Sequence, residues 1–256
     1  AMLLRADNPV LRTSAVRSMR AMPPTQRYLM LRPFIDDVSL SVRMEVAQVL
    51  AGVPESELRP KDIAELNPLF AEYLAVQNDH LDMPSVQLQL ANFWLDRGEA
   101  GKAEAALTEA LLLNPQLEPA LINLVDLLRR NGKDTKASQL LSDAIQQSPD
   151  AGTLWFSQGL HQIRLGDTKA GLASLKRAAE LEDEGSRHRY VYAIALNDTG
   201  SKSEAMSVLE ALNSRHPGQA DVLNGLLAFA RDAGDRRRYE QYRTQLVTVL
   251  QATGAR

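Results

Sequence analysis

Apolar residues recur three and four positions apart along most of the chain, which is the spacing of one face of an α-helix. In residues 86–97 they are Leu88, Leu90, Ala91, Trp94 and Leu95. Residues 102–113 carry a similar stripe of Ala103, Ala106, Leu107 and Ala110. Alanine and leucine dominate, and aromatic residues make up only 5% of the 256 residues, a composition that favours helix over sheet. We therefore expect an all-α protein.

Glycine recurs at a fixed interval of 34 residues in the C-terminal part of the chain, at Gly98, Gly132, Gly166, Gly200 and Gly234. With 14 glycines in 256 residues, composition counting gives this spacing a chance of about 2 in a hundred thousand. Glycine can adopt the left-handed conformation that ends a helix. The interval therefore predicts a repeated unit with a helix terminus at each glycine.

Other positions recur with the same interval. Five residues after the first four glycines stand Ala103, Ala137, Gly171 and Ala205, and nine residues after them stand Leu107, Leu141, Leu175 and Leu209. The first, second and fourth units end with a proline, at Pro115, Pro149 and Pro217, and Asp183 occupies this position in the third unit. Tyr239 and Arg243 break both columns in the last unit. This pattern predicts that each unit forms two helices, which approach each other closely at the small residues. The pair must stack on the pair of a neighbouring unit to bury its apolar face.

The spacing resembles the tetratricopeptide repeat, a helix–turn–helix unit of the same length. The resemblance implies a right-handed α-solenoid over residues 84–253, with repeats at 84–117, 118–151, 152–185 and 186–219 and a degenerate one at 220–253. Residues 61–83 are predicted to form a linking helix, with Ile63, Leu66, Leu69 and Phe70 on one face, that covers the first repeat.

The first 60 residues follow a different interval. The run Asp7-Asn8-Pro9-Val10-Leu11-Arg12 returns loosely about 30 residues later in residues 37–43. Each copy precedes a predicted helix, at 11–22 and 41–51, and a further helix is predicted at 24–31. An Asp followed by Val-Arg and an Ala/Leu-rich helix resembles HEAT-type repeats, so residues 1–60 are interpreted as HEAT-like and residues 52–60 as the joint.

Charge and cysteine content exclude several classes of function. The formal net charge is −3 and cysteine is absent. The chain lacks the excess of basic residues that is typical of nucleic-acid-binding proteins. Without cysteine it cannot form disulfides, use a thiolate in catalysis, hold zinc through cysteine or attach haem covalently. No run approaches the length of about 18 apolar residues that a membrane helix needs, so membrane insertion is not expected. Any signal peptide is expected upstream of Met2.

Candidate chemistry is sparse. His80, His161, His188 and His216 show no metal-ligand spacing, so surface histidines are expected and no metal site. The acidic run 180–184 and the basic run 236–238 are interpreted as solvated turns and faces. The sequence pattern brings no two ionisable side chains together for general acid–base catalysis, so we expect no enzyme and no cofactor.

The inner face of the first helix of each repeat is the candidate binding surface, because solenoids present concave surfaces to partners. The candidate partner-binding residues are Asn92, Asn123, Asp126, Arg129, Phe156, Arg164, Tyr190, Asn197 and Arg231. Phe156, Tyr190 and Arg129 are the expected anchors for a peptide or protein. Asn92 and Asn123 match the Asn pair of tetratricopeptide domains that clamp a carboxylate, but Leu88, Thr153 and Ser157 replace the other clamp residues. Occupation of the groove by the protein's own termini stays open.

Two functions follow. The first is a non-catalytic scaffold for protein interaction. The second rests on the order of the regions and on residues 190–193 (Tyr-Val-Tyr-Ala) and 231–235, which resemble the C-terminal part of bacterial multihaem c-type cytochromes. That resemblance implies a periplasmic accessory region with a redox partner or an upstream cytochrome domain; otherwise the compartment is left open, with the cytoplasm as the default. Cys-x-x-Cys-His motifs upstream of Met2 would discriminate between the two.

Overall fold

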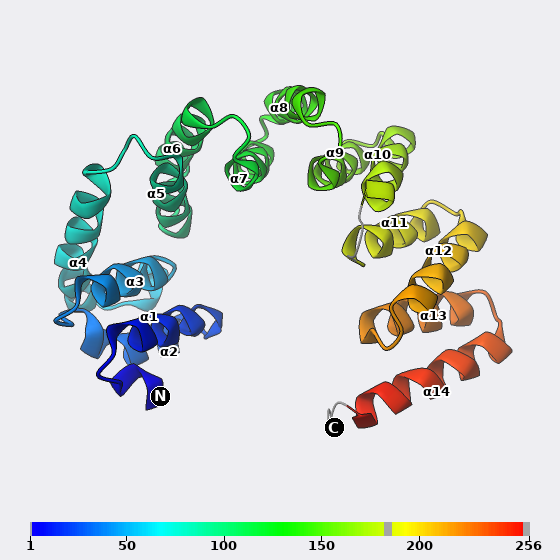
Figure 1. The fold of residues 1–256 in the computed structure, drawn as a ribbon, viewed down its shortest axis with the longest axis horizontal. Coiled ribbons are helices and arrows are strands. Elements are labelled where there is room, and N and C mark those ends of the chain that lie inside the picture. The colour runs from blue at the N-terminus through cyan, green and yellow to red at the C-terminus, as the bar shows by residue number, and fades with distance from the viewer. Residues whose placement is uncertain (1, 182–185, 253–256) are drawn as a thin grey trace. The chain divides into compact units, whose positions relative to one another are not determined.

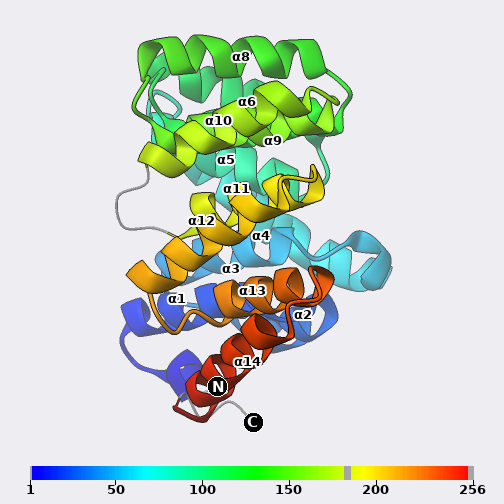
Figure 2. The same cartoon turned by 90° about the vertical axis from the view of Figure 1, so that its right-hand side faces the viewer.

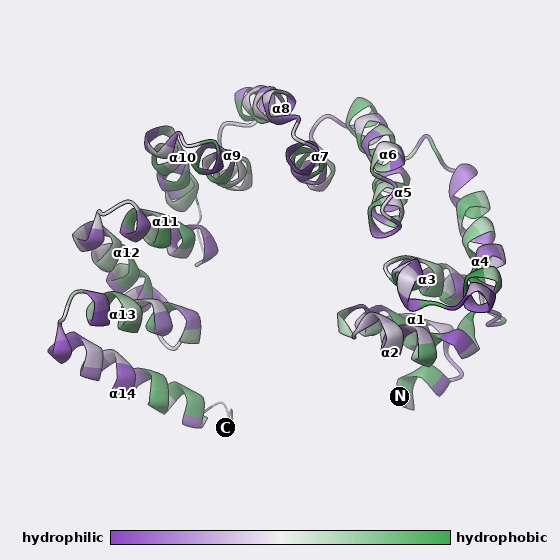
Figure 3. Cartoon of the chain, turned by 180° about the vertical axis from the view of Figure 1, so that it is seen from behind, coloured by the Kyte–Doolittle hydropathy of each residue, from purple (hydrophilic) through white to green (hydrophobic). Residues whose placement is uncertain are grey.

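A computed structural model describes residues 2–181 and 186–252. Within these residues the chain forms fourteen α-helices and four short 3₁₀ helices, and no strand (Figure 1). The predicted all-α class is confirmed. Polar and apolar residues are interleaved along the helices (Figure 3). No helix in the described ranges is long and apolar enough to cross a membrane.

The helices gather into two compact units, Ala1–Lys133 and Asp134–Arg256. Helices α1 to α7 belong to the N-terminal unit and α8 to α14 to the C-terminal unit. The division falls between the two helices of the repeat predicted at residues 118–151, and not near residue 60, where the sequence predicts a change of repeat type. The assignment of HEAT-like repeats to residues 1–60 stays a prediction.

The N-terminal unit contains seven α-helices. They are α1 (Pro9–Ser18), α2 (Pro24–Leu31), α3 (Leu40–Ala51), α4 (Pro60–Asn78), α5 (Pro84–Asp96), α6 (Ala100–Leu113) and α7 (Glu118–Arg130). The 3₁₀ helices are Met2–Arg5, Met19–Ala21, Arg32–Phe34 and Glu55–Glu57. Proline begins α1, α2, α4 and α5, where its missing N–H costs nothing and its fixed φ suits a helix.

Helix α3 forms the centre of the N-terminal unit. It contacts α1, α2, α4 and α5, and Val42, Val46 and Val49 are fully buried. Beside it, the ring of Tyr73 from α4 stacks on that of Phe93 from α5 at 4.9 Å between centroids. Large apolar side chains and aromatic stacking therefore join the N-terminal helices to the first predicted tetratricopeptide hairpin.

Ion pairs link the two copies of the N-terminal sequence pattern. Arg12 of α1 donates to both carboxylate oxygens of Asp37, at 3.0 and 2.8 Å. At the corresponding place in the second copy, Arg43 donates to Glu72 of α4. Each arginine thus reaches an acid 25 or 29 residues further along the chain. The repeated sequence pattern produces a repeated side-chain link.

The C-terminal unit contains α8 (Asp134–Gln147), α9 (Gly152–Arg164), α10 (Thr168–Leu181), α11 (Arg187–Asp198), α12 (Lys202–Arg215), α13 (Ala220–Asp232) and α14 (Arg236–Ala252). Figure 2 shows α9 lying along α10. The leucine column is buried as predicted, since Leu141, Leu175 and Leu209 are fully enclosed. On α14, Arg243 is exposed and only Tyr242 is buried, as the broken columns of the last repeat predict.

The glycine column ends helices as predicted. All five glycines have positive φ, between 69° and 93°. After each of them the chain turns into the next helix within one or two residues. A side chain is rarely accommodated in this backbone conformation, so the recurrence of glycine every 34 residues records a conformational requirement of the turn.

Candidate functional site

Carboxamide side chains from three helices line a cavity of about 250 Å³ in the N-terminal unit. Gln48 comes from α3, Gln89 and Asn92 from α5, and Asn123 from α7. We call these four residues the carboxamide surface. Gln89 and Asn92 lie three residues apart and therefore share one face of α5. Asn92 and Asn123 were predicted from the sequence, and the structure brings them together.

Hydrogen bonds fix the orientation of these side chains. Asn123 Nδ2 donates to Asn92 Oδ1 at 2.9 Å. Gln48 Nε2 donates to Tyr73 Oη at 3.0 Å and to Gln89 Oε1 at 3.3 Å. Burial raises the pKa of Tyr73 to about 12, so its hydroxyl stays protonated over the physiological range. The remaining donor and acceptor atoms of the carboxamides make no hydrogen bond to another described residue.

An arginine closes one side of the cavity. Arg20 Nη1 donates to Asp96 at 2.8 Å, and its Nη2 donates to the backbone carbonyl of Gln48 at 3.1 Å. One turn beyond Asn123, the predicted residues Asp126 and Arg129 form a pair with 3.4 Å between oxygen and nitrogen. The charges beside the carboxamide surface are therefore paired, and the cavity presents mainly neutral hydrogen-bonding groups.

The other predicted binding residues lie in the C-terminal unit. Arg164 pairs with Asp134 of α8, and Arg231 pairs with its neighbour Asp232. Asn197 is half-buried. Tyr190 is half-buried against α13, where a Cβ added to Gly225 would lie 3.3 Å from the tyrosine ring. The predicted continuous surface through both units stays a prediction.

Phe156 is a core residue, so its predicted exposure is wrong. Only 6% of it is accessible. Its ring stacks on His188 at 4.6 Å between centroids, and the guanidinium of Arg187 lies 5.3 Å from its centre. The residues at the start of α11 thus cover a side chain that helical periodicity placed on an open face. Phe156 is not a candidate anchor for a partner.

The prediction of surface histidines fails at His161, which is 3% exposed. Its Nε2 lies 2.9 Å from Ser138 Oγ, and its Nδ1 lies 3.3 Å from Arg164. His80 is exposed, and His188 and His216 are half-buried. In the part of the chain that the structure describes, no group of three or more histidine and acidic side chains is arranged to hold a metal ion.

Arg236 and Arg237 of the basic run are exposed, as predicted, and Arg238 is half-buried. Arg238 reaches Glu210 of α12 at 3.2 Å and Asp235 at 3.8 Å, so it links α14 to α12. In the acidic run, Glu180 is exposed and pairs with Arg177 at 3.8 Å. Residues 182–184, including Asp183 of the proline column, lie outside the described residues.

Sequence reasoning missed Gln48 and Gln89. Gln48 lies outside the region of the 34-residue interval and Gln89 inside it, so no single interval relates them. Gln89 also lies between Leu88 and Asn92, which the repeat places on its inner face, and is not itself one of those positions. The one available signal was the spacing of Gln89 and Asn92 on α5, which puts two carboxamides on one helix face.

Comparisons with known proteins place the tetratricopeptide repeat in the middle of the chain. Residues 94–156 match the family model described as tetratricopeptide repeat. A stretch of 97 residues is 35% identical to cellulose synthase operon protein C of Komagataeibacter xylinus. That stretch is 38% of this chain and only 8% of the longer protein.

Solved structures show the same fold at low identity. The MamA protein superposes with a TM-score of 0.54 at 15% identity, over 67% of this chain and 93% of that one. A tetratricopeptide repeat protein from Parabacteroides merdae gives 0.53 at 15% identity, over 83% of this chain and 88% of that one. The chain is thus an all-α repeat protein with a tetratricopeptide segment, and its fold is that of tetratricopeptide solenoids.

Proposed function

We propose that this protein is a non-catalytic scaffold that binds an extended segment of a partner polypeptide on the carboxamide surface. The observation that carries the proposal is the convergence of Gln48, Gln89, Asn92 and Asn123 on one cavity. Solenoids that contain tetratricopeptide repeats present such surfaces to other proteins. The fold and the repeat segment therefore support the general function, and the cavity supports its location.

Carboxamides suit a peptide backbone because each supplies a donor and an acceptor. An extended backbone likewise offers N–H and C=O groups that must be paired when they leave water. The bond from Asn123 to Asn92 leaves the amide of Asn92 and the carbonyl oxygen of Asn123 for a ligand. Paired charges beside them, such as Arg20 with Asp96, favour a ligand recognised by its backbone over one recognised by its charge.

The test uses two forms of the full chain as bait for proteins from the source cell. The variant Asn92→Ala/Asn123→Ala should lose a partner that the natural chain captures. A peptide from that partner should then bind the variant at least about tenfold more weakly in a direct titration. Both side chains lie at the surface or half-buried, so thermal unfolding of the variant should match that of the natural chain.

Asn78→Ala is the matched control, because Asn78 is an exposed asparagine at the end of α4 in the same unit and does not line the cavity. Equal capture by the natural chain, the double variant and this control would contradict the proposed location. Loss of capture together with a lowered melting temperature would assign the two asparagines to stability instead.

The accessory role beside a multihaem cytochrome is the second proposal carried over from the sequence. It rests on the resemblance in residues 190–193 and 231–235. Its test is the gene itself: Cys-x-x-Cys-His motifs in frame upstream of residue 2 would support it, and their absence would remove it. The relative in Komagataeibacter xylinus matches only through a fraction of its length, so we propose no role in cellulose synthesis.

A further inference from the structure

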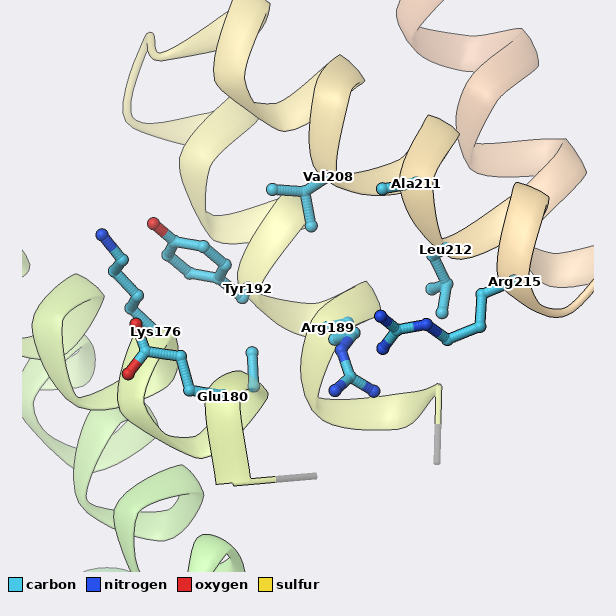
Figure 4. Close-up of a pocket in the computed structure, with 9 residues that line it drawn as sticks. Lys176, Glu180, Arg189, Tyr192, Val208, Ala211, Leu212 and Arg215 are labelled. Carbon is cyan, nitrogen blue, oxygen red and sulfur yellow. The ribbon is translucent and has the colours of Figure 1, made fainter. Parts of the chain in front are cut away.

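A second cavity lies in the C-terminal unit between α10, α11 and α12 (Figure 4). Its volume is about 350 Å³, which is at the lower end of the range of ligand pockets. None of the nine predicted binding residues lines it. Its walls combine an apolar floor with a charged rim, a combination that the repeat columns do not require.

The floor of this cavity is rigid and apolar. It is formed by Ala179 of α10, Tyr192 of α11, and Val208 and Leu212 of α12. The hydroxyl of Tyr192 donates to Glu204 at 3.1 Å, and burial together with Glu204 raises the pKa of Tyr192 to about 12. The hydroxyl is therefore a neutral donor bonded to Glu204, and the ring provides an apolar wall of the cavity.

The rim carries three cations and one acid. Lys176, Arg189 and Arg215 come from three different helices, and Glu180 is the single carboxylate. Glu180 already pairs with Arg177, whereas Lys176 and Arg215 form no ion pair within the described residues. Figure 4 shows Arg189 and Arg215 near one end of the cavity and Lys176 near the other. Although the whole chain is acidic, Lys176 and Arg215 offer two positive charges to an anionic ligand at this cavity.

We propose that this cavity is a second binding site, for an acidic segment of a partner protein that inserts one large apolar side chain. The apolar side chain would bury itself against Tyr192 and Leu212, as an interface anchor does. Carboxylates on both sides of it would pair with the cations at the two ends of the rim, with arginine able to bind bidentately. The site is independent of the carboxamide surface, which lies in the other unit.

The probe is a fluorescein-labelled peptide, Asp-Glu-Asp-Phe-Glu-Asp-Asp, titrated against the full chain by fluorescence anisotropy. Two comparison peptides replace the central Phe by Ala, or every acid by its amide. We expect saturable binding of the probe, with affinity falling as salt is raised. Both comparison peptides should bind at least about tenfold more weakly, because each lacks one of the two contacts.

Variants of the rim locate the binding. Lys176→Glu/Arg215→Glu reverses two of the charges and should weaken the probe at least about tenfold. Arg215→Gln is the milder variant to be used if the double variant melts at a lower temperature. Arg237→Glu is the control, because Arg237 is exposed on α14 and does not line the cavity; it should bind the probe as the natural chain does.

Several outcomes would overturn the site. These are absence of saturable binding up to about 1 mM probe, equal binding of the Ala peptide, or the same loss in Arg237→Glu as in the rim variants. Binding of decanoate without binding of the probe would assign the cavity to free carboxylates instead. Asn92→Ala/Asn123→Ala should leave the probe's affinity unchanged, so failure here and failure of the carboxamide surface are distinguishable.

Discussion

The two units differ in their most buried ion pairs and in how closely their helices approach. In the N-terminal unit, Arg12 reaches Asp37 and Arg17 reaches Glu45 across helices, and the two acids are only 9% and 8% exposed. The acids in the other links of the N-terminal unit are 24 to 54% exposed, and those in the links of the C-terminal unit are 32 to 84% exposed. The helices of the C-terminal unit approach most closely between α9 and α10, where an added Cβ would lie 2.7 Å from Leu175 at Gly159 and 2.5 Å from Ile163 at Gly171.

This difference has a consequence for stability. Partly buried ion pairs depend on pH and on the loss of either partner, whereas close packing depends on volume and shape. The chain's two tryptophans allow the units to be followed separately, because Trp94 lies in α5 and Trp155 in α9. Trp155→Phe leaves a reporter in the N-terminal unit, and Trp94→Phe leaves one in the C-terminal unit.

The largest effect is expected from Leu175→Ala. Leu175 is fully buried and fills the space beside Gly159, so truncation leaves a cavity that the close helix pair cannot collapse to fill. The free energy of unfolding should fall by about 2–5 kcal/mol. Urea unfolding followed by Trp155 measures it.

The matched substitution in the N-terminal unit is Leu107→Ala, at the same place in its repeat and equally buried. It should lower the stability reported by Trp94. If Leu175→Ala shifts both reporters by the same amount, the two units unfold as one and the comparison loses its basis.

The next largest effect is expected from Arg12→Leu. This change leaves Asp37 with the backbone N–H of Ser39 and the more distant charge of Arg43, but without its two strongest donors. Leaving a nearly buried charged group without its donors costs about 1–3 kcal/mol. The fluorescence of Trp94 should report this lower free energy of unfolding, and high salt should not restore the original value.

Arg243→Leu provides the control for a surface pair. Arg243 and Glu240 lie on the same helix, and both are more than half exposed. Removal of such a pair changes stability by less than about 0.5 kcal/mol. A loss as large as that of Arg12→Leu would show that burial of the acid is not the deciding property.

The sequence predicted the elements governed by short-range rules. The glycine, alanine and leucine residues that recur every 34 positions located the helix ends and the contacts between the helices of each repeat. They could do so because the same packing recurs in successive repeats. It could not predict the burial of Phe156, which depends on where the start of α11 lies. Likewise, Gln48 joins Asn92 only through the packing of α3 against α5, and the 34-residue interval does not extend to α3.

A smaller effect, equal in both units, is expected from replacing the turn glycines. Gly98 and Gly166 have φ of 74° and 88°, and nothing lies within 4 Å of an added Cβ at either. Alanine therefore meets backbone strain alone, about 1–2 kcal/mol. Trp94 should report this loss for Gly98→Ala, and Trp155 the same loss for Gly166→Ala.

Gly101 provides the matched control for these glycines. It lies near the start of α6 in open space and without a positive φ, so Gly101→Ala should raise stability slightly. A clearly larger loss in one unit than in the other would show that the turns, and not only the helix contacts, differ between the units.

The smallest effect is expected from acid, and it should be confined to the N-terminal unit. Burial alone would raise the pKa of Asp37, but hydrogen bonds from Arg12 and from the N–H of Ser39 outweigh burial and hold this pKa below its usual range. A hydrogen bond from Arg43 lowers the pKa of Glu72 in the same way. Because both values are lower in the folded state, their contribution is present above about pH 4 and is lost as pH falls through the folded pKa.

The urea midpoint reported by Trp94 should therefore fall more steeply between about pH 5 and 3 than the midpoint reported by Trp155. The effect is small because protonation removes a charge and leaves the helix contacts in place. Arg12→Leu/Arg43→Leu should flatten the pH dependence of the Trp94 midpoint, since no arginine then lowers the pKa of either carboxyl. Persistence of the steep dependence in this double variant would show that other carboxylates, such as Asp62 with its pKa lowered by Arg59, set the acid sensitivity of the N-terminal unit.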